Sequence, residues 1–185
     1  MSAAPQLRRT DKLMSEADAR ALVEQAYSGR LATVGADGWP YVCPLLHVWF
    51  DGEVWLHNTS ARGHLRSNVD HASRVCFEID EPGAVFPYGR FECDTSVAYR
   101  SVVLFGAIRI VDDRAQKTAF FDALMRKYAN ADTGRPKGFY PRLDAVTVYA
   151  ITVERITGKE TLLPATTQQW PAADFTKSPG ARASH

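Results

Sequence analysis

The sequence lacks most features that would place it in a specialised class of protein. Its 185 residues include only three cysteines, Cys43, Cys76 and Cys93, and no Cys-x-x-Cys pair. That pattern fits buried thiols in a reduced cytoplasm better than a disulfide framework. The net charge is only +1, which gives no bulk attraction to nucleic acid or to an acidic membrane surface. Apolar runs such as 102–105 are far too short to span a bilayer, and residues 1–14 contain no signal-peptide core, so we expect a cytoplasmic protein.

Several catalytic motifs are missing as well. There is no Walker loop, no Ser/His/Asp set in a credible order and no paired-carboxylate pattern. His57, His64 and His71 recur every seven residues, but we expect them on a strand, at a helix start and at a helix end. Their side chains would diverge, and no cysteine or carboxylate joins them at a ligand spacing, so we predict no metal site.

The composition is that of one ordinary globular domain. Hydrophobic residues make up 45% of the chain and charged residues 23%, over a length that allows a substantial core. We expect residues 1–14 to form a flexible arm and residues 15–163 to form the domain. Residues 164–185 would form a tail that is ordered only around Trp170.

Hydrophobic periodicity and turn residues predict a mainly β protein with flanking helices. We expect strands at 31–35, 41–50, 53–58, 74–80, 97–111 and 145–156, and helices after Ser15, Ser60 and Asp113. Residues 81–96 contain two prolines and two glycines and are expected to form a long loop. Gly106, inside a strand, suggests a bulge or a close approach of another group.

The Asp51–Gly52 turn sets the register of a hairpin that is apolar on both faces. It pairs Phe50 with Glu53 and places His57 opposite Leu46. One face carries Leu45, His47, Trp49, Val54 and Leu56, and the other carries Leu46, Val48, Phe50, Trp55 and His57. A hairpin buried on both sides suggests a small antiparallel barrel whose outer face is covered by a helix, a ligand or a second subunit.

The most informative segment is 55–66, where an apolar strand runs into a short helix. Thr59 and Ser60 supply hydroxyls just before the helix, and Arg62 adds a fixed positive charge. Free N–H groups at a helix start attract anions, so this segment predicts a site for a phosphate-bearing cofactor. The hydroxyls could instead only cap the helix, the arginines could form a solvated face, and His57 could be a core histidine.

Several short strings, in their order, resemble the FMN-binding split-barrel superfamily related to pyridoxamine 5'-phosphate oxidase, and most of all its nitroimidazole-resistance (Nim-type) branch. The strings are Gly29–Thr33, Pro40–Leu45, Leu56–Asn58, Gly63–Asn68, Tyr99–Val103, Val148–Ile151, Thr157–Glu160 and Trp170–Pro171. Together they span roughly residues 10–172.

The resemblance implies a six-stranded antiparallel split β-barrel with Greek-key topology, assembled as a homodimer with two flavin sites at the subunit interface. It implies a catalytic role for His57 beside the flavin ring. The cofactor-binding positions that it implies are Leu45, Leu46, His57, Asn58, Thr59, Ser60, Arg62, Gly63, His64, Leu65, Tyr99, Arg100, Ser101 and Val102. Of these, Tyr99–Val102 could come from the other subunit.

The chain departs from its relatives at Leu65, where many of them have a lysine after the Gly-His pair. The phosphate would then depend on Ser60, Arg62, His64 and Arg66, and FAD, haem or a deazaflavin are alternatives to FMN. The arginine-rich C-terminal signature of pyridoxamine phosphate oxidases is not evident, so vitamin B6 chemistry is not expected.

The expected function is an FMN-dependent oxidoreductase that uses NAD(P)H to reduce a small acceptor such as a nitroaromatic, a quinone or a flavin. The alternative is a non-catalytic module or sensor that binds haem, flavin or deazaflavin.

Overall fold

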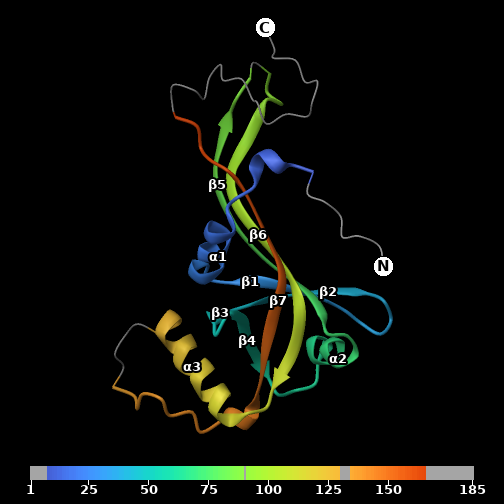
Figure 1. Cartoon of the computed structure of the whole chain (residues 1–185), viewed down its shortest axis with the longest axis vertical. Coiled ribbons are helices and arrows are strands. Elements are labelled where there is room, and N and C mark those ends of the chain that lie inside the picture. Colours follow the sequence, from blue (N-terminus) through green and yellow to red (C-terminus); the bar gives the residue numbers. More distant parts are fainter. Residues whose placement is uncertain (1–7, 90, 130–133, 166–185) are drawn as a thin grey trace.

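The chain folds as one sheet of seven antiparallel strands with helices packed around it (Figure 1). This computed structural model describes residues 8–89, 91–129 and 134–165. The helices in these ranges are η1 (Thr10–Lys12), α1 (Glu16–Gln25), α2 (His64–His71), α3 (Arg114–Tyr128) and η2 (Leu143–Ala145). The strands are β1 (Gly29–Val34), β2 (Pro40–Leu45), β3 (His47–Phe50), β4 (Glu53–Thr59), β5 (Arg74–Pro87), β6 (Thr95–Val111) and β7 (Val146–Thr161).

The prediction of six strands is wrong by one, because the expected strand 41–50 is two strands. Leu45 still pairs with Gly29 of β1, whereas His47 already pairs with Leu56 of β4. These two partners belong to opposite ends of the sheet order β2-β1-β5-β6-β7-β4-β3. The chain therefore has to leave one end of the sheet at Leu46 and enter the other.

The strand order confirms the predicted Greek-key topology. β5, β6 and β7 follow one another as antiparallel neighbours, and β4 lies beside β7 rather than beside β5. A Greek key consists of three consecutive antiparallel strands and a fourth, joined by a long connection, at the far side of the three; here the fourth strand is β4, which precedes the others, and α2 lies in the connection. The mainly β sheet with flanking helices is consistent with a split barrel.

Both faces of the β3–β4 hairpin are buried, as its alternation predicts. Val54 and Leu56 belong to an inner core, which the sheet shares with α1 and α2. Val48 and Trp55 belong to a second cluster, the α3 core. The full α3 core consists of Val48, Trp55, Val111, Phe120, Ala123, Leu124, Val148 and Ala150. A helix of the same chain, α3, therefore covers the outer face.

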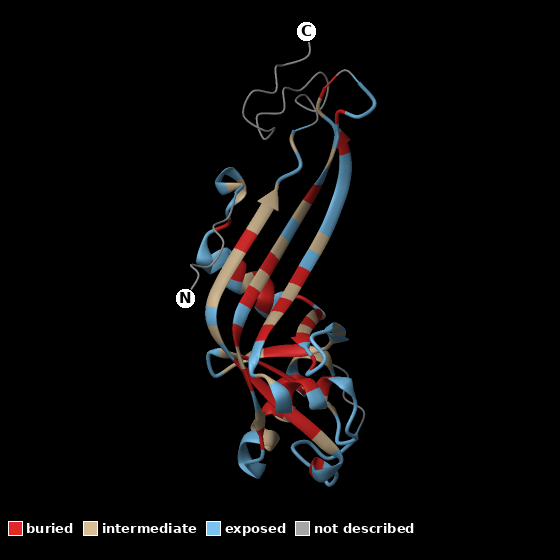
Figure 2. Ribbon diagram, turned by 90° about the vertical axis from the view of Figure 1, so that its right-hand side faces the viewer, coloured by how far each residue is buried: buried red, intermediate tan, exposed pale blue. Residues whose placement is uncertain are grey.

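The expected loop at 81–96 is mostly strand. β5 and β6 form a long hairpin that extends past the barrel, with alternating buried and exposed positions near its base (Figure 2). The pairing changes register between Pro82 and Val85, which accommodates the proline and glycine that suggested a loop. A Cβ at Gly83 would crowd the Ala98 carbonyl oxygen, so glycine permits the close approach of the two strands there.

The predicted irregularity at Gly106 is confirmed. The register between β6 and β7 shifts between Phe105 and Gly106. A Cβ on Gly106 would overlap the backbone carbonyl of Thr152, so the bulge depends on a residue without a side chain.

The helix caps at Ser15 and Asp113 lie where the sequence predicts helix starts. The Ser15 side chain accepts a hydrogen bond from the Asp18 N–H at the start of α1, and Asp113 does the same for Gln116 at the start of α3. Just before α1, Leu13 bridges to Lys159 and Met14 is buried in the inner core. Residues 1–7 of the expected arm, and Trp170 with the tail from residue 166, lie outside the described residues.

His47, at the start of β3, is a buried histidine of the inner side of the barrel. Its ring is fully buried and donates from Nε2 to the Val23 carbonyl oxygen at 2.7 Å. It also packs edge-on against Phe77, with 5.1 Å between ring centroids. Burial, together with the nearby Lys127 ammonium, lowers its pKa from 6.5 to about 4. The ring is therefore neutral at neutral pH.

We expect the free energy of unfolding to fall as the pH falls from 6.5 to 4, because the unfolded chain then binds a proton at His47 that the folded protein does not. The pKa difference corresponds to about 3 kcal/mol, and the loss levels off below pH 4. Urea unfolding across this range should show a flatter profile for H47Q, whose amide can still donate to Val23. The surface substitution H71Q should leave the slope unchanged, and equal slopes for H47Q and the native protein would contradict the assignment.

Candidate functional site

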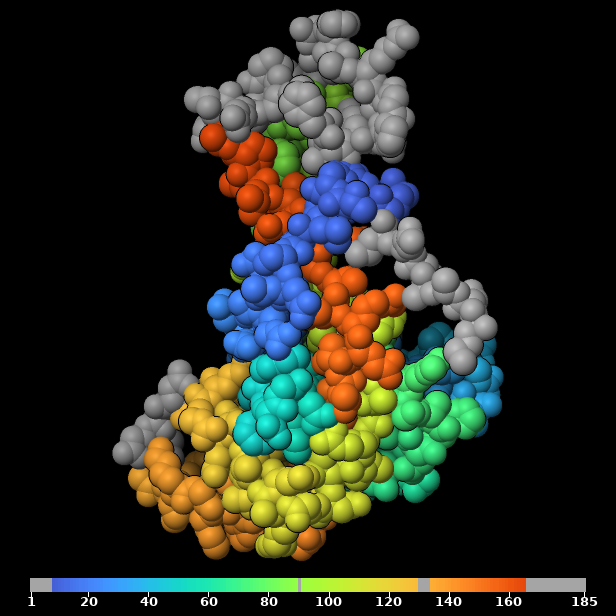
Figure 3. All heavy atoms as spheres, in the orientation of Figure 1, coloured from blue at the N-terminus to red at the C-terminus, as the bar shows by residue number. Residues whose placement is uncertain are grey.

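The segment from β4 to α2 reaches the surface beside the β1–β2 hairpin (Figure 3). The Ser60 N–H donates to the Ala145 carbonyl at 3.0 Å, which holds the connection against the start of β7. α2 begins after Gly63 without a side-chain cap, unlike α1 and α3. A Cβ at Gly63 would meet no atom within 4 Å, so the start of α2 faces open space. The first-turn N–H groups are therefore available to an anion.

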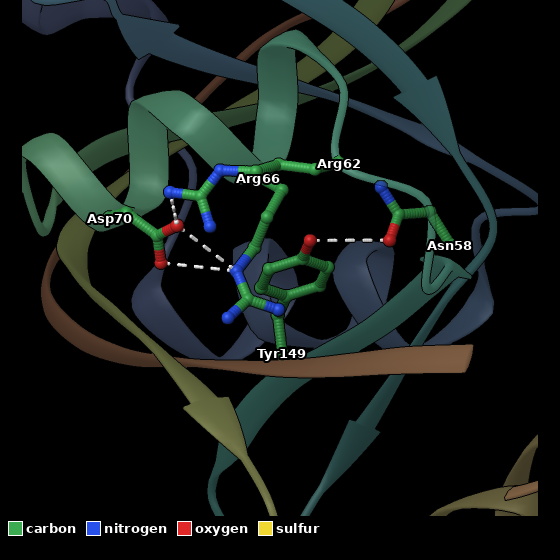
Figure 4. A network of polar contacts seen from close by, with 5 residues as sticks. All are labelled: Asn58, Arg62, Arg66, Asp70 and Tyr149. Carbon is green, nitrogen blue, oxygen red and sulfur yellow. Dashed lines mark hydrogen bonds and ion pairs between the residues drawn. The ribbon is translucent and has the colours of Figure 1, made fainter. Parts of the chain in front are cut away.

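Two guanidinium groups, those of Arg62 before α2 and Arg66 in its first turn, lie along this helix and meet the carboxylate of Asp70 in its last turn (Figure 4). Arg62 Nη2 lies 2.6 Å from Asp70 Oδ2, and Arg66 Nε lies 3.0 Å from Asp70 Oδ1. The Arg62 side chain is 66% exposed and that of Arg66 is 29% exposed. His64 stacks on Tyr41 of β2 at 5.3 Å between ring centroids. The cluster provides positive charge at an accessible surface, held in place by one aspartate.

Strand alternation sends the polar residues of β4 to opposite sides. Asn58 faces the α2 side, where its Oδ1 accepts a hydrogen bond from the Tyr149 hydroxyl at 3.2 Å (Figure 4). Burial raises the pKa of Tyr149, against the opposing effects of Asn58 and Arg66. Tyr149 is therefore a neutral donor at the floor of the charged cluster.

His57 faces α3 instead. Its ring lies 5.1 Å from the Phe121 ring and 5.8 Å from the Phe120 ring, both in edge-on contact. Among the described residues, its buried Nδ1 has no hydrogen-bond partner. Burial lowers its pKa, so the ring is neutral at pH 7 and can exchange one further hydrogen bond. Phe121 also lines an apolar hollow of about 230 Å³ next to Tyr140 and Leu143.

The other predicted cofactor residues are dispersed within one chain. The Leu65 and Val102 side chains are buried in the inner core, and Leu45 packs against it. Tyr99, Arg100 and Ser101 lie in the first half of β6, beside the end of β7. Arg100 is ion-paired there with Glu81 of β5. Thr59 is exposed at the end of β4, whereas Leu46 is half-buried between β2 and β3.

Three residues of the cluster were not predicted: Tyr41, Asp70 and Tyr149. The spacing of Arg66 and Asp70, four residues apart on a helix, is typical of an ion pair and could have indicated Asp70. Tyr149 meets Asn58 only because β7 pairs with β4, and no local pattern shows that pairing.

Two features are absent from the described residues. These residues contain no group of three His, Cys, Asp or Glu side chains that could hold a metal ion. In the same ranges, no helix has the length and apolarity needed to cross a membrane.

The sequence profile of the pyridoxamine 5'-phosphate oxidase family matches residues 15–160 of this chain. No curated protein matches the sequence. The profile covers α1 and the seven strands except for Thr161, the last residue of β7, together with the charged cluster at α2.

Solved structures of distant relatives share the fold. A candidate 5-nitroimidazole antibiotic resistance protein from Bacteroides thetaiotaomicron matches with a TM-score of 0.67 at 19% identity, over 80% of this chain and 86% of that one. A flavocytochrome from Azotobacter vinelandii matches with a TM-score of 0.74 at 17% identity, over 86% and 73%. An FAD- and haem-binding protein from Mycobacterium smegmatis matches with a TM-score of 0.70 at 20% identity, over 85% and 78%. At these identities the matches show the fold alone.

Proposed function

Because the chain belongs to the pyridoxamine 5'-phosphate oxidase family, we propose that it binds a phosphorylated flavin, with FMN as the first candidate. The observation that carries the proposal is the uncapped start of α2 with Arg62 and Arg66 beside it. Relatives of the same fold are described as binding FAD, or FAD and haem, which supports a flavin as the ligand.

The residues present fit a phosphate at this position. Gly63 leaves open space at the helix start, and the helix dipole favours an anion there. Arg62 and Arg66 can both donate charge-assisted hydrogen bonds, and the exposed Ser60 can donate from its hydroxyl. Leu65 follows the Gly63–His64 pair where many relatives have a lysine, and its side chain is turned into the inner core. The two arginines therefore supply the positive charge.

The bound flavin would supply the redox chemistry, taking hydride from NAD(P)H and passing electrons to a small acceptor such as a nitroaromatic, a quinone or a second flavin. The family resemblance assigns His57 the position beside the ring; in this structure its side chain faces α3, on the side of β4 opposite the α2 cluster. Its neutral imidazole has an unpaired buried Nδ1 and can hold one hydrogen bond to a ligand edge. The role that we assign to His57 is to orient and polarise the flavin ring through a hydrogen bond from a neutral imidazole.

We also propose that the protein is a homodimer with a flavin at each side of the subunit interface. Exposed apolar side chains along β5 and β6 support a second copy, namely Val85, Val97 and Phe105. Tyr99–Val102 lies on the same hairpin, and in a dimer it could reach the flavin of the partner. Light scattering of the purified protein would report the mass.

The flavin assignment predicts that FMN raises the melting temperature. Ligand at 100 times its Kd adds about 2.7 kcal/mol of stability, which corresponds to roughly 5–10 °C for a chain of this size. Riboflavin lacks the phosphate and should give a much smaller shift. We expect a flavin absorption band in the purified protein, bleached by NAD(P)H.

No shift with saturating FMN or FAD would refute flavin binding. A Soret band without flavin binding would favour the haem alternative, and flavin binding without NAD(P)H turnover would favour the non-catalytic module.

A further inference from the structure

Asp70 lies one helical turn beyond Arg66 and contacts both arginines of the α2 cluster. Its Oδ2 lies 2.6 Å from Arg62 Nη2, and its Oδ1 accepts from Arg66 Nε at 3.0 Å. Figure 4 shows the two arginine side chains converging on this one carboxylate. Arg62 comes from the connection before α2 and Arg66 from its first turn, so Asp70 holds them together.

The carboxylate halves the positive charge that the cluster offers to a ligand. Two guanidinium groups contribute two positive charges and Asp70 removes one. A phosphate monoester carries close to two negative charges at neutral pH, because its second pKa is near 6. Each phosphate of a diphosphate diester such as that of FAD carries one negative charge. The net charge of the cluster therefore matches one phosphate of a diester better than a monoester.

Resting on the phosphate site proposed above, we infer that Asp70 is a specificity-determining residue, which disfavours a doubly charged phosphate monoester relative to a singly charged phosphodiester. Among flavins, Asp70 therefore lowers the affinity for FMN relative to that for FAD. A phosphate bound to guanidinium groups that remain paired with Asp70 lies about 6 Å from its carboxylate, where one extra negative charge costs roughly tenfold in affinity.

The test compares the Kd values of FMN, FAD and riboflavin for the native protein and for D70N. We expect D70N to bind FMN about tenfold more tightly, FAD less than threefold more tightly and riboflavin unchanged, so that the preference moves toward FMN. E16Q, which removes the carboxylate of the i,i+4 pair with Arg20 on α1, is the matched control and should leave all three Kd values unchanged. Weaker FMN binding by D70N, or an unchanged ratio of the FAD and FMN Kd values, would overturn the inference.

A second probe separates this inference from the flavin assignment. If neither protein binds a flavin, the proposed function fails, and stabilisation by inorganic phosphate then decides the role of Asp70. A larger phosphate-induced rise in melting temperature for D70N than for the native protein would support that role. Equal rises would show that Asp70 only forms a helix ion pair with Arg66.

Discussion

Replacing Arg62 and Arg66 together with alanine should weaken FMN binding by at least about 100-fold. Each guanidinium can donate a charge-assisted hydrogen bond to a phosphate, and such bonds contribute about 1.5–3 kcal/mol each. Both side chains lie at the open start of α2, where no other arginine or lysine of the helix replaces them. Isothermal titration calorimetry of the apo protein with FMN measures the loss directly.

Riboflavin provides the internal comparison, because its affinity should change little in the same double variant. R20A is the matched control, since Arg20 is 46% exposed and pairs with Glu16 at 2.9 Å on α1. If the double variant lost FMN and riboflavin affinity equally, the arginines would act on the fold or on the ring site, not on the phosphate.

Phe120→Ala should lower the free energy of unfolding by about 3–5 kcal/mol, a range typical of buried phenylalanine truncations. Phe120 is fully buried in the α3 core. Its ring stacks on Trp55 at 6.0 Å between centroids and contacts His57 at 5.8 Å. The substitution therefore leaves a cavity between α3 and β4. Urea unfolding, followed by tryptophan fluorescence, reports the change.

Phe121→Ala is the neighbouring control. Phe121 is only half-buried and lines the apolar hollow, so its truncation should cost about 1–2 kcal/mol. An equal effect of the two substitutions would mean that α3 does not press Phe120 into the sheet as described.

Local sequence patterns predicted much of the fold. The Asp51–Gly52 turn predicted the hairpin register, and both residues have positive φ angles, 51° and 77°. The Ser15 and Asp113 caps predicted two helix starts. The apolar alternation on both faces predicted a covered hairpin. Each of these signals is set by neighbours in the sequence.

The errors arose where distant segments decide the structure. Residues 41–50 read as one continuous strand, and only their two different partners, β1 and β4, divide them. Pro82 and Gly83 indicated a loop, but the pairing with β6 continues past them through a change of register. Neither the identity of a partner strand nor the tolerance of a bulge can be recognised from the residues of the segment alone.

Local sequence chemistry predicted where the candidate site lies, but it identified only some of the residues that form it. The strand-to-helix connection with Arg62 was predicted as the anion position, and the structure places open space there. The sequence did not show that Asp70 offsets the arginines or that Tyr149 reaches Asn58. It also gave no sign that α3 is the element covering His57.

The pairing of β4 with β7 decides when the site can form during synthesis. Thr59 pairs with Val146, so the strand that leads into α2 is completed by a segment made much later. Closing so long a separation in sequence is entropically costly and slows folding. A nascent chain that ends before residue 145 has neither the Ala145 carbonyl that anchors Ser60 nor the Tyr149 hydroxyl for Asn58. Ligand capture therefore has to wait until the first residues of β7 have left the ribosome.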